Sequence, residues 1–98
     1  MKFSIEFSDR ARDNLLDLRK QDQQVVVDAI EVQLTNEPDK PTRNRKRLEE
    51  NPLAPWELRI GGFRAFYDID PKAEKVVVVA IAQKIHNKLS IGGEEIEL

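Results

Sequence analysis

The sequence predicts an α+β domain in which two helices pack on one face of a mostly antiparallel sheet. Apolar and polar residues alternate near the N-terminus and again across residues 56–69, as in half-buried strands. Between these stretches, two segments place apolar residues at helical spacing. A length of 98 residues suits one core, so we expect a single domain over residues 1–98.

The N-terminal part predicts a strand followed by a helical hairpin. Apolar residues at every second position predict a strand over residues 2–7. Ser8 or Asp9 then offers an N-cap for a helix over residues 10–20. A second helical pattern covers residues 22–35. Because little chain separates the two helices, we expect them to pack antiparallel.

The C-terminal half predicts a three-stranded antiparallel meander. The expected strands cover Trp56–Ile60, residues 63–69 and residues 76–82. A glycine pair at 61–62 is typical of a two-residue hairpin turn. The last strand is apolar throughout, so we expect it to be covered on both faces. Residues 83–98 are polar and predict a tail without a regular element.

The composition excludes several classes of protein. The chain has no cysteine, which rules out disulfides, a thiolate nucleophile and a zinc–thiolate site. Its longest apolar run is far too short to cross a bilayer, and its start is unlike a signal peptide. We therefore expect a cytoplasmic protein with no membrane contact. No phosphate-binding glycine loop, metal cluster or serine triad is visible, so no cofactor or metal is expected.

Charge is unevenly distributed along the chain. The net charge is −2, which argues against a general nucleic-acid binder. Residues 1–39 carry a net −4, residues 40–64 carry +4 and residues 65–98 carry −2. The basic middle falls partly in a proline-rich segment, residues 36–55, which predicts a loop. The densest basic run there consists of Arg43, Arg45, Lys46 and Arg47. These residues either contact an RNA backbone or form a solvated loop.

The glycine pair fixes the register of the predicted hairpin. A two-residue turn at 61–62 sets Arg59 opposite Arg64, and Trp56 opposite Tyr67. The apolar pairs then share one face, so we expect Trp56 and Tyr67 in the core rather than stacked on a base. Two guanidinium groups lie across from each other on the other face, which is unfavourable unless an anion offsets them.

Two anions can offset the paired guanidinium groups. A bound phosphate is one, since arginine offers planar bidentate donors to phosphate oxygens. The carboxylate of Glu57 or Asp68 is the other, on a solvated sheet face. Phe66 shares this face, where its ring can stack on a base or lie under a partner's segment.

The segment from Arg43 to Lys84 resembles the RelE/ParE superfamily of toxins from type II toxin–antitoxin systems. The hairpin LRIGGFRAFYDI, residues 58–69, carries the closest resemblance, and the order of elements agrees over nearly the whole chain. The tail GGEEIEL is similar to a less characterised branch of the superfamily. The resemblance implies a small toxin held inactive by a cognate antitoxin that wraps around it.

The resemblance also implies roles for individual residues. RelE-like toxins cut mRNA in the ribosomal A site by using the RNA 2′-hydroxyl as nucleophile, which requires a base, an acid and positive charge near the phosphate. Arg64 matches the superfamily's hairpin arginine, and Arg59 matches a basic strand position. Glu57 stands where relatives often carry lysine and is a candidate base. Lys84 and His86 follow the last strand, where relatives place basic or catalytic groups, although a lone histidine is often incidental. Some relatives have a catalytic tyrosine at their C-terminal end, and the tail of this sequence has no tyrosine.

Three functions remain open from the sequence. The first is a ribosome-dependent mRNA endoribonuclease that needs no metal. The second is a ParE-like inhibitor of DNA gyrase that acts without catalysis. The third is a toxin-fold module that has lost toxicity and only binds its partner; the missing tyrosine, the replaced lysine and the negative net charge favour it.

Overall fold

A computed structural model describes residues 2–49 and 53–96 and contains two helices followed by most of a sheet. The helices α1 (Asp9–Leu16) and α2 (Lys20–Leu34) follow strand β1 (Ser4–Phe7). The remaining strands are β2 (Arg45–Arg47), β3 (Trp56–Ile60), β4 (Phe63–Asp70), β5 (Lys75–Ile85), β6 (Lys88–Ile91) and β7 (Glu94–Ile96). The expected α+β class and its strand–helix–helix–strand order are confirmed. None of the helices in the described part is long and apolar enough to span a membrane.

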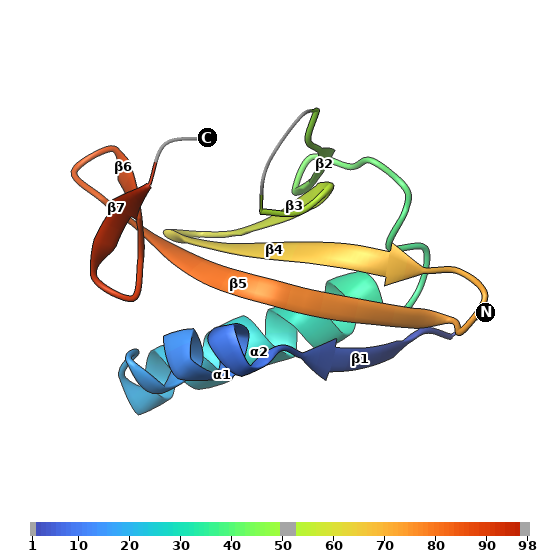
Figure 1. The fold of residues 1–98 in the computed structure, drawn as a ribbon, viewed down its shortest axis with the longest axis horizontal. Coiled ribbons are helices and arrows are strands. Elements are labelled where there is room, and N and C mark those ends of the chain that lie inside the picture. Colours follow the sequence, from blue (N-terminus) through green and yellow to red (C-terminus); the bar gives the residue numbers. More distant parts are fainter. Residues whose placement is uncertain (1, 50–52, 97–98) are drawn as a thin grey trace.

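The described strands form one sheet in the order β2-β3-β4-β5-β6-β7, and β1 pairs with β5. β1 runs parallel to the first part of β5, whereas β6 pairs antiparallel with its last three residues. Both helices cover one face of this sheet, and the β6–β7 hairpin lies at the far end of β5 (Figure 1). The central hairpin has the predicted register, with Arg59 opposite Arg64 and Trp56 opposite Tyr67.

Ser8 and Asn14 attach α1 to the edge of β5. The Ser8 hydroxyl caps the helix by accepting from the Ala11 N–H (3.0 Å), and it donates to the carbonyl of Val79 (2.8 Å). The buried Asn14 side chain accepts from the Ile81 N–H (3.0 Å). Helix α1 ends at Leu16, earlier than predicted, since the chain turns there and Leu18 packs on the core before α2 begins.

β5 contains a β-bulge, and the sheet buries residues on both of its faces. Phe66 pairs with Ala80 and Tyr67 with Val78, so Val79 is an extra residue on β5. The helix-side core contains the buried residues Ala11, Val26, Ile30, Leu34, Trp56, Leu58, Ile60, Ala65, Tyr67, Val76, Val78 and Ile81. A second, smaller cluster contains Ala54, Phe66, Ala80, Ala82 and Ile91. The predicted coverage of residues 76–82 on both faces is confirmed.

The expectation of an irregular tail is wrong for residues 83–96, while residues 97–98 lie outside the described part. β5 continues to Ile85, and two further strands follow it through tight turns. His86 and Asn87 both have positive φ (50° and 66°), as a two-residue hairpin turn requires. Gly92 and Gly93 form the next turn. The hairpin is held in place because Leu89, Ile91 and Ile96 pack against the second cluster.

Alkaline pH tests the burial of Tyr67, the single tyrosine of the chain. Burial raises the pKa of its phenol far above the ordinary range; the Arg45 guanidinium opposes this and Asp39 adds to it. Its hydroxyl donates to the Pro38 carbonyl (2.7 Å). The unfolded chain loses the tyrosine proton first, so we expect the free energy of unfolding to fall as pH rises above about 10. Denaturant titrations check this, and Tyr67→Phe should remove part of the slope; an equal slope in both proteins contradicts it.

Candidate nucleic-acid interface

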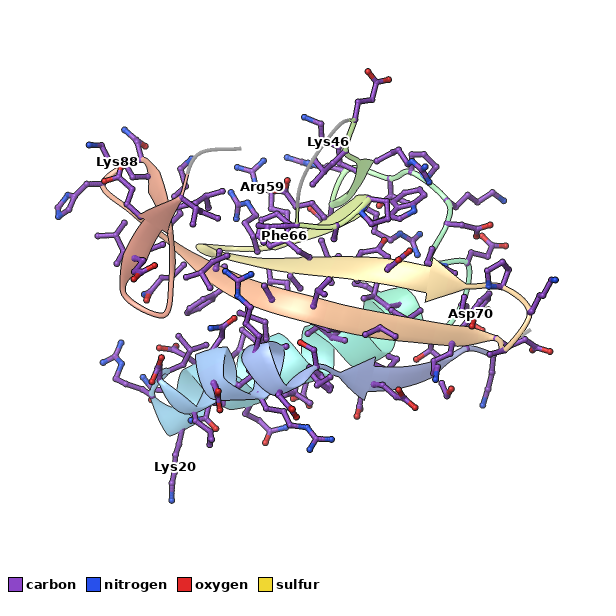
Figure 2. All side chains as sticks on the ribbon, in the orientation of Figure 1. Lys20, Lys46, Arg59, Phe66, Asp70 and Lys88 are labelled. Atoms are coloured by element: carbon purple, nitrogen blue, oxygen red, sulfur yellow. The ribbon has the colours of Figure 1, made fainter. Side chains whose placement is uncertain are left out.

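A shallow hollow opens on the sheet face away from the helices, where β3, β4 and the end of β5 meet the chain around β2. Its volume is about 310 Å³, and we call it the basic depression. The described residues that line it are Arg43, Asn44, Lys46, Glu57, Arg59, Arg64 and Lys84. Figure 2 shows Lys46 and Arg59 on this side of the molecule and Lys20 on the helix side. Five of the seven lining residues are cationic and one is acidic, so the depression favours an anion.

Backbone pairing brings these side chains together from distant parts of the sequence. Lys46 on β2 lies opposite Glu57 on β3, and Arg59 lies opposite Arg64 on β4. The Lys84 N–H donates to the carbonyl of Gly62 (2.7 Å), which ties the end of β5 to the hairpin turn. The sequence-predicted residues Arg43, Lys46, Glu57, Arg59, Arg64 and Lys84 therefore share one site.

Most of the cations in the basic depression are free to bind a ligand. Arg43, Lys46, Arg59 and Lys84 are exposed, and none forms a salt bridge with a described residue. Such a cation can pair with a phosphate of a nucleic acid, and this pairing releases counterions from the nucleic acid.

The Arg64 side chain contacts other groups of the protein and is largely buried. Its side chain is 8% exposed, and Nε lies 3.2 Å from Glu57 Oε1. Nη1 donates to the carbonyls of Gly61 and Phe63, both at 2.8 Å. The Glu57 carboxylate, one of the anions considered for the arginine pair, contacts Arg64 and is half-buried rather than solvated. Asp68 instead accepts from the N–H of Ile69 (2.7 Å).

Arg45, a candidate RNA contact from the sequence, is not among the residues that line the depression, and its guanidinium binds backbone carbonyls. Its Nη1 donates to the carbonyl of Gln33 in the last turn of α2 (2.7 Å), and to those of Asn36 (3.2 Å) and Glu37 (2.9 Å) just beyond the helix. The last carbonyls of a helix lack intrahelical partners, so a guanidinium there satisfies groups that are otherwise left open. Arg45 has this structural role because it lies in a strand next to the helix end. The sequence pattern did not predict that strand.

We expect Arg45→Ala to lower the free energy of unfolding by about 2 kcal/mol, since it removes charged hydrogen bonds to several carbonyls. The neighbouring exposed Lys46→Ala is the matched control and should change stability by less than about 0.5 kcal/mol. Urea unfolding of both variants provides the measurement. Equal stabilities for the two variants would show that Arg45 does not hold the helix end.

Three further candidates, Phe66, His86 and Arg47, are not among the residues that line the depression. Phe66 is fully buried in the second cluster, so its ring offers no free face to a base, which corrects the stacking expectation. His86 is exposed in the β5–β6 turn and is not among the residues that line the depression. Arg47 lies over the ring of Trp56, with Cζ 5.7 Å from the ring centroid. Trp56 itself is buried against Tyr67, with centroids 6.0 Å apart, as predicted.

A second hollow of about 370 Å³ adjoins the basic depression. Arg43, Asn44 and Arg59 line both hollows, and Gly61 completes the second. Sequence reasoning missed Asn44, whose only signal was its place inside the basic run. Among the described residues no group of three histidine or acidic side chains comes together in a way that can hold a metal ion.

Comparison with known proteins defines the class. The protein-family model described as the ParE toxin of the type II toxin–antitoxin system, parDE, matches residues 5–84 of this chain. The chain therefore belongs to the ParE toxin family and is a type II toxin of the RelE/ParE superfamily. The β6–β7 hairpin lies beyond the matched residues.

Two solved structures have a similar fold. The RelBE2 toxin–antitoxin complex from Mycobacterium tuberculosis matches with a TM-score of 0.71 and 25% identity, over 85% of this chain and 99% of that chain. The archaeal RelE–RelB complex from Pyrococcus horikoshii OT3 matches with a TM-score of 0.69 and 16% identity, over 88% of this chain and 99% of that chain. No curated protein matches the sequence.

Proposed function

We propose that this toxin is a ribosome-dependent mRNA endoribonuclease that binds RNA phosphates in the basic depression. The observation that carries the proposal is the group of four exposed cations around one hollow, none of them in a salt bridge with a described residue: Arg43, Lys46, Arg59 and Lys84. Charge-assisted hydrogen bonds to phosphate oxygens are stronger than neutral ones. The adjoining hollow lengthens this surface, as a strand of several nucleotides requires. Since ribosomes are the site of action, we place the toxin in the cytoplasm.

The lining residues supply the groups that metal-free RNA cleavage requires. The RNA 2′-hydroxyl attacks the adjacent phosphorus and expels the 5′-oxygen of the next nucleotide, leaving a 2′,3′-cyclic phosphate. Glu57 is the carboxylate of the depression and accepts the 2′-hydroxyl proton. Lys84 gives a proton to the leaving oxygen. Arg59 stabilises the charge that develops on the phosphorane, while Arg64 holds Glu57 in place.

A translation reaction tests this function directly. Purified toxin is added to mRNA with and without ribosomes, and cleavage is mapped by primer extension. We expect new 5′ ends only when ribosomes are present. Intact mRNA in both reactions rules the nuclease out. Growth arrest on expression without a partner adds a second readout, and unimpaired growth favours the non-toxic binding module.

Inhibition of DNA gyrase is the second candidate function. The match of residues 5–84 to the ParE toxin family favours it, together with the missing catalytic tyrosine. A supercoiling assay with purified gyrase separates the two candidates. Loss of supercoiling with intact mRNA supports the gyrase inhibitor, whereas unchanged supercoiling at saturating toxin rejects it.

We also propose a cognate antitoxin as partner. Both similar structures are described as toxin–antitoxin complexes. In the part of the chain that the structure describes, four large apolar side chains are exposed: Leu16, Val25, Val32 and Ile85. Such side chains are candidates for coverage by an antitoxin segment. Co-expression with the antitoxin should relieve growth arrest, and persistent arrest in the presence of bound antitoxin contradicts this role.

A further inference from the structure

Glu57 is the one carboxylate among the described residues that line the basic depression. Its strand neighbours are Lys46 on β2 and Phe66 on β4. Phe66 is buried, whereas Glu57 is partly exposed and lines the depression together with the cations. A ligand phosphate that reaches the depression therefore meets this carboxylate as well as the cations.

The contact between Glu57 and Arg64 is largely shielded from water. The two side chains are 18% and 8% exposed, and their facing atoms are 3.2 Å apart. At this exposure the charges are screened less than a surface pair, so each strongly affects any third charge nearby. Arg64 cannot swing away, because Nη1 is fixed by the carbonyls of Gly61 and Phe63. Among the described residues the Glu57 carboxylate has no comparable second anchor and is held by Arg64 alone.

A phosphate oxygen and a carboxylate oxygen present the same acceptor to a guanidinium N–H. We propose that Glu57 is an internal counter-anion that competes with RNA phosphate for Arg64 and keeps the affinity of the free toxin for RNA low. This inference rests on the proposed RNA-binding function of the depression. Low affinity makes free RNA a poor ligand, whereas RNA held on a ribosome is presented at a high effective concentration. The carboxylate thus favours the ribosome-bound substrate.

The test compares two variants that remove the same charge at different places. Glu57→Gln keeps the shape of the side chain and an oxygen that can accept from Arg64 Nε. Glu6→Gln is the matched control, because Glu6 is also paired with a cation, Lys75 Nζ at 3.3 Å, on the distant strand β1. The probe is a short, fluorescently labelled single-stranded RNA, and its dissociation constant is measured by anisotropy over a range of salt concentrations.

We expect Glu57→Gln to bind the RNA about tenfold more tightly than wild type, since a charge close to the phosphate is removed. The slope of log affinity against log salt should steepen by about 0.7, as one more phosphate contact forms. Glu6→Gln should stay within about twofold of wild type. Equal affinity in the two variants, or weaker binding by Glu57→Gln, overturns the proposal.

A second variant and a second readout keep the result interpretable. Glu57→Ala also removes the charge and should bind more tightly than wild type if it is folded, as checked by circular dichroism. Cleavage is scored separately: Glu57→Gln should bind tightly but not cut, since it lacks the base. Tighter binding without any cleavage by wild type supports the counter-anion and rejects the nuclease. Cleavage by wild type with unchanged affinity in Glu57→Gln and Glu57→Ala rejects the counter-anion alone.

Discussion

Replacing Arg59 and Lys84 together by alanine is expected to lower ribosome-dependent mRNA cleavage by roughly 100-fold or more. The two residues come from different strands, and both are exposed and line the basic depression. Arg59 stabilises charge on the phosphorane in the proposed mechanism, and Lys84 protonates the leaving oxygen. The loss should appear in the rate of cleavage under saturating ribosome-bound mRNA, because both groups act on the transition state.

The control for this double variant removes two cations from the opposite side of the molecule. Arg10 on α1 and Lys20 on α2 are exposed, and Figure 2 places Lys20 on the helix side. Arg10→Ala with Lys20→Ala changes the net charge equally and should retain cleavage within about threefold, since the sites are far from the depression. If both double variants lose the same activity, net charge rather than the depression governs function.

Phe66→Ala is expected to lower the free energy of unfolding by about 3–5 kcal/mol. Phe66 is fully buried and is the largest member of the second cluster, whose other buried members are Ala54, Ala80, Ala82 and Ile91. Small neighbours cannot fill the cavity left by a phenyl ring, so little of the loss is recovered by repacking. The β6–β7 hairpin rests on the same cluster and should become more susceptible to proteolysis.

Urea unfolding measures this loss, with Leu16→Ala as control. Leu16 is 72% exposed on α1, so its truncation should change stability by less than about 0.5 kcal/mol. A Phe66→Ala protein with wild-type stability but weakened RNA binding contradicts the core role. That result would instead support the RNA-stacking role that the sequence suggested for the Phe66 ring.

The central hairpin was predictable from the sequence because its register depends on local chemistry. A glycine pair allows a two-residue turn, and the pairing of every later residue follows from it. Arg59 therefore lies opposite Arg64, as expected. Glu57, which forms the salt bridge with Arg64, was also among the anions considered from the sequence. It lies only two positions from Arg59 on the same strand.

The roles of Arg45 and of residues 83–98 depended on contacts that sequence pattern does not encode. Arg45 reaches the end of α2 only because β2 adds to β3 beside that helix. The polar tail forms strands because His86 and Asn87 adopt positive φ, which allows a tight turn. Its few apolar residues also pack against the second cluster. Alternation in that tail is too short to stand out against a polar background.

The central claim, that RNA binds in the basic depression, is tested most directly by nuclear magnetic resonance. Short single-stranded RNA is titrated into isotope-labelled toxin, and shifts of backbone amides are mapped onto the fold. We expect the largest shifts around Arg43, Lys46, Arg59 and Lys84, with little change in α1 and α2. Shifts confined to the helices, or none at RNA concentrations that saturate the anisotropy signal, would contradict the claim.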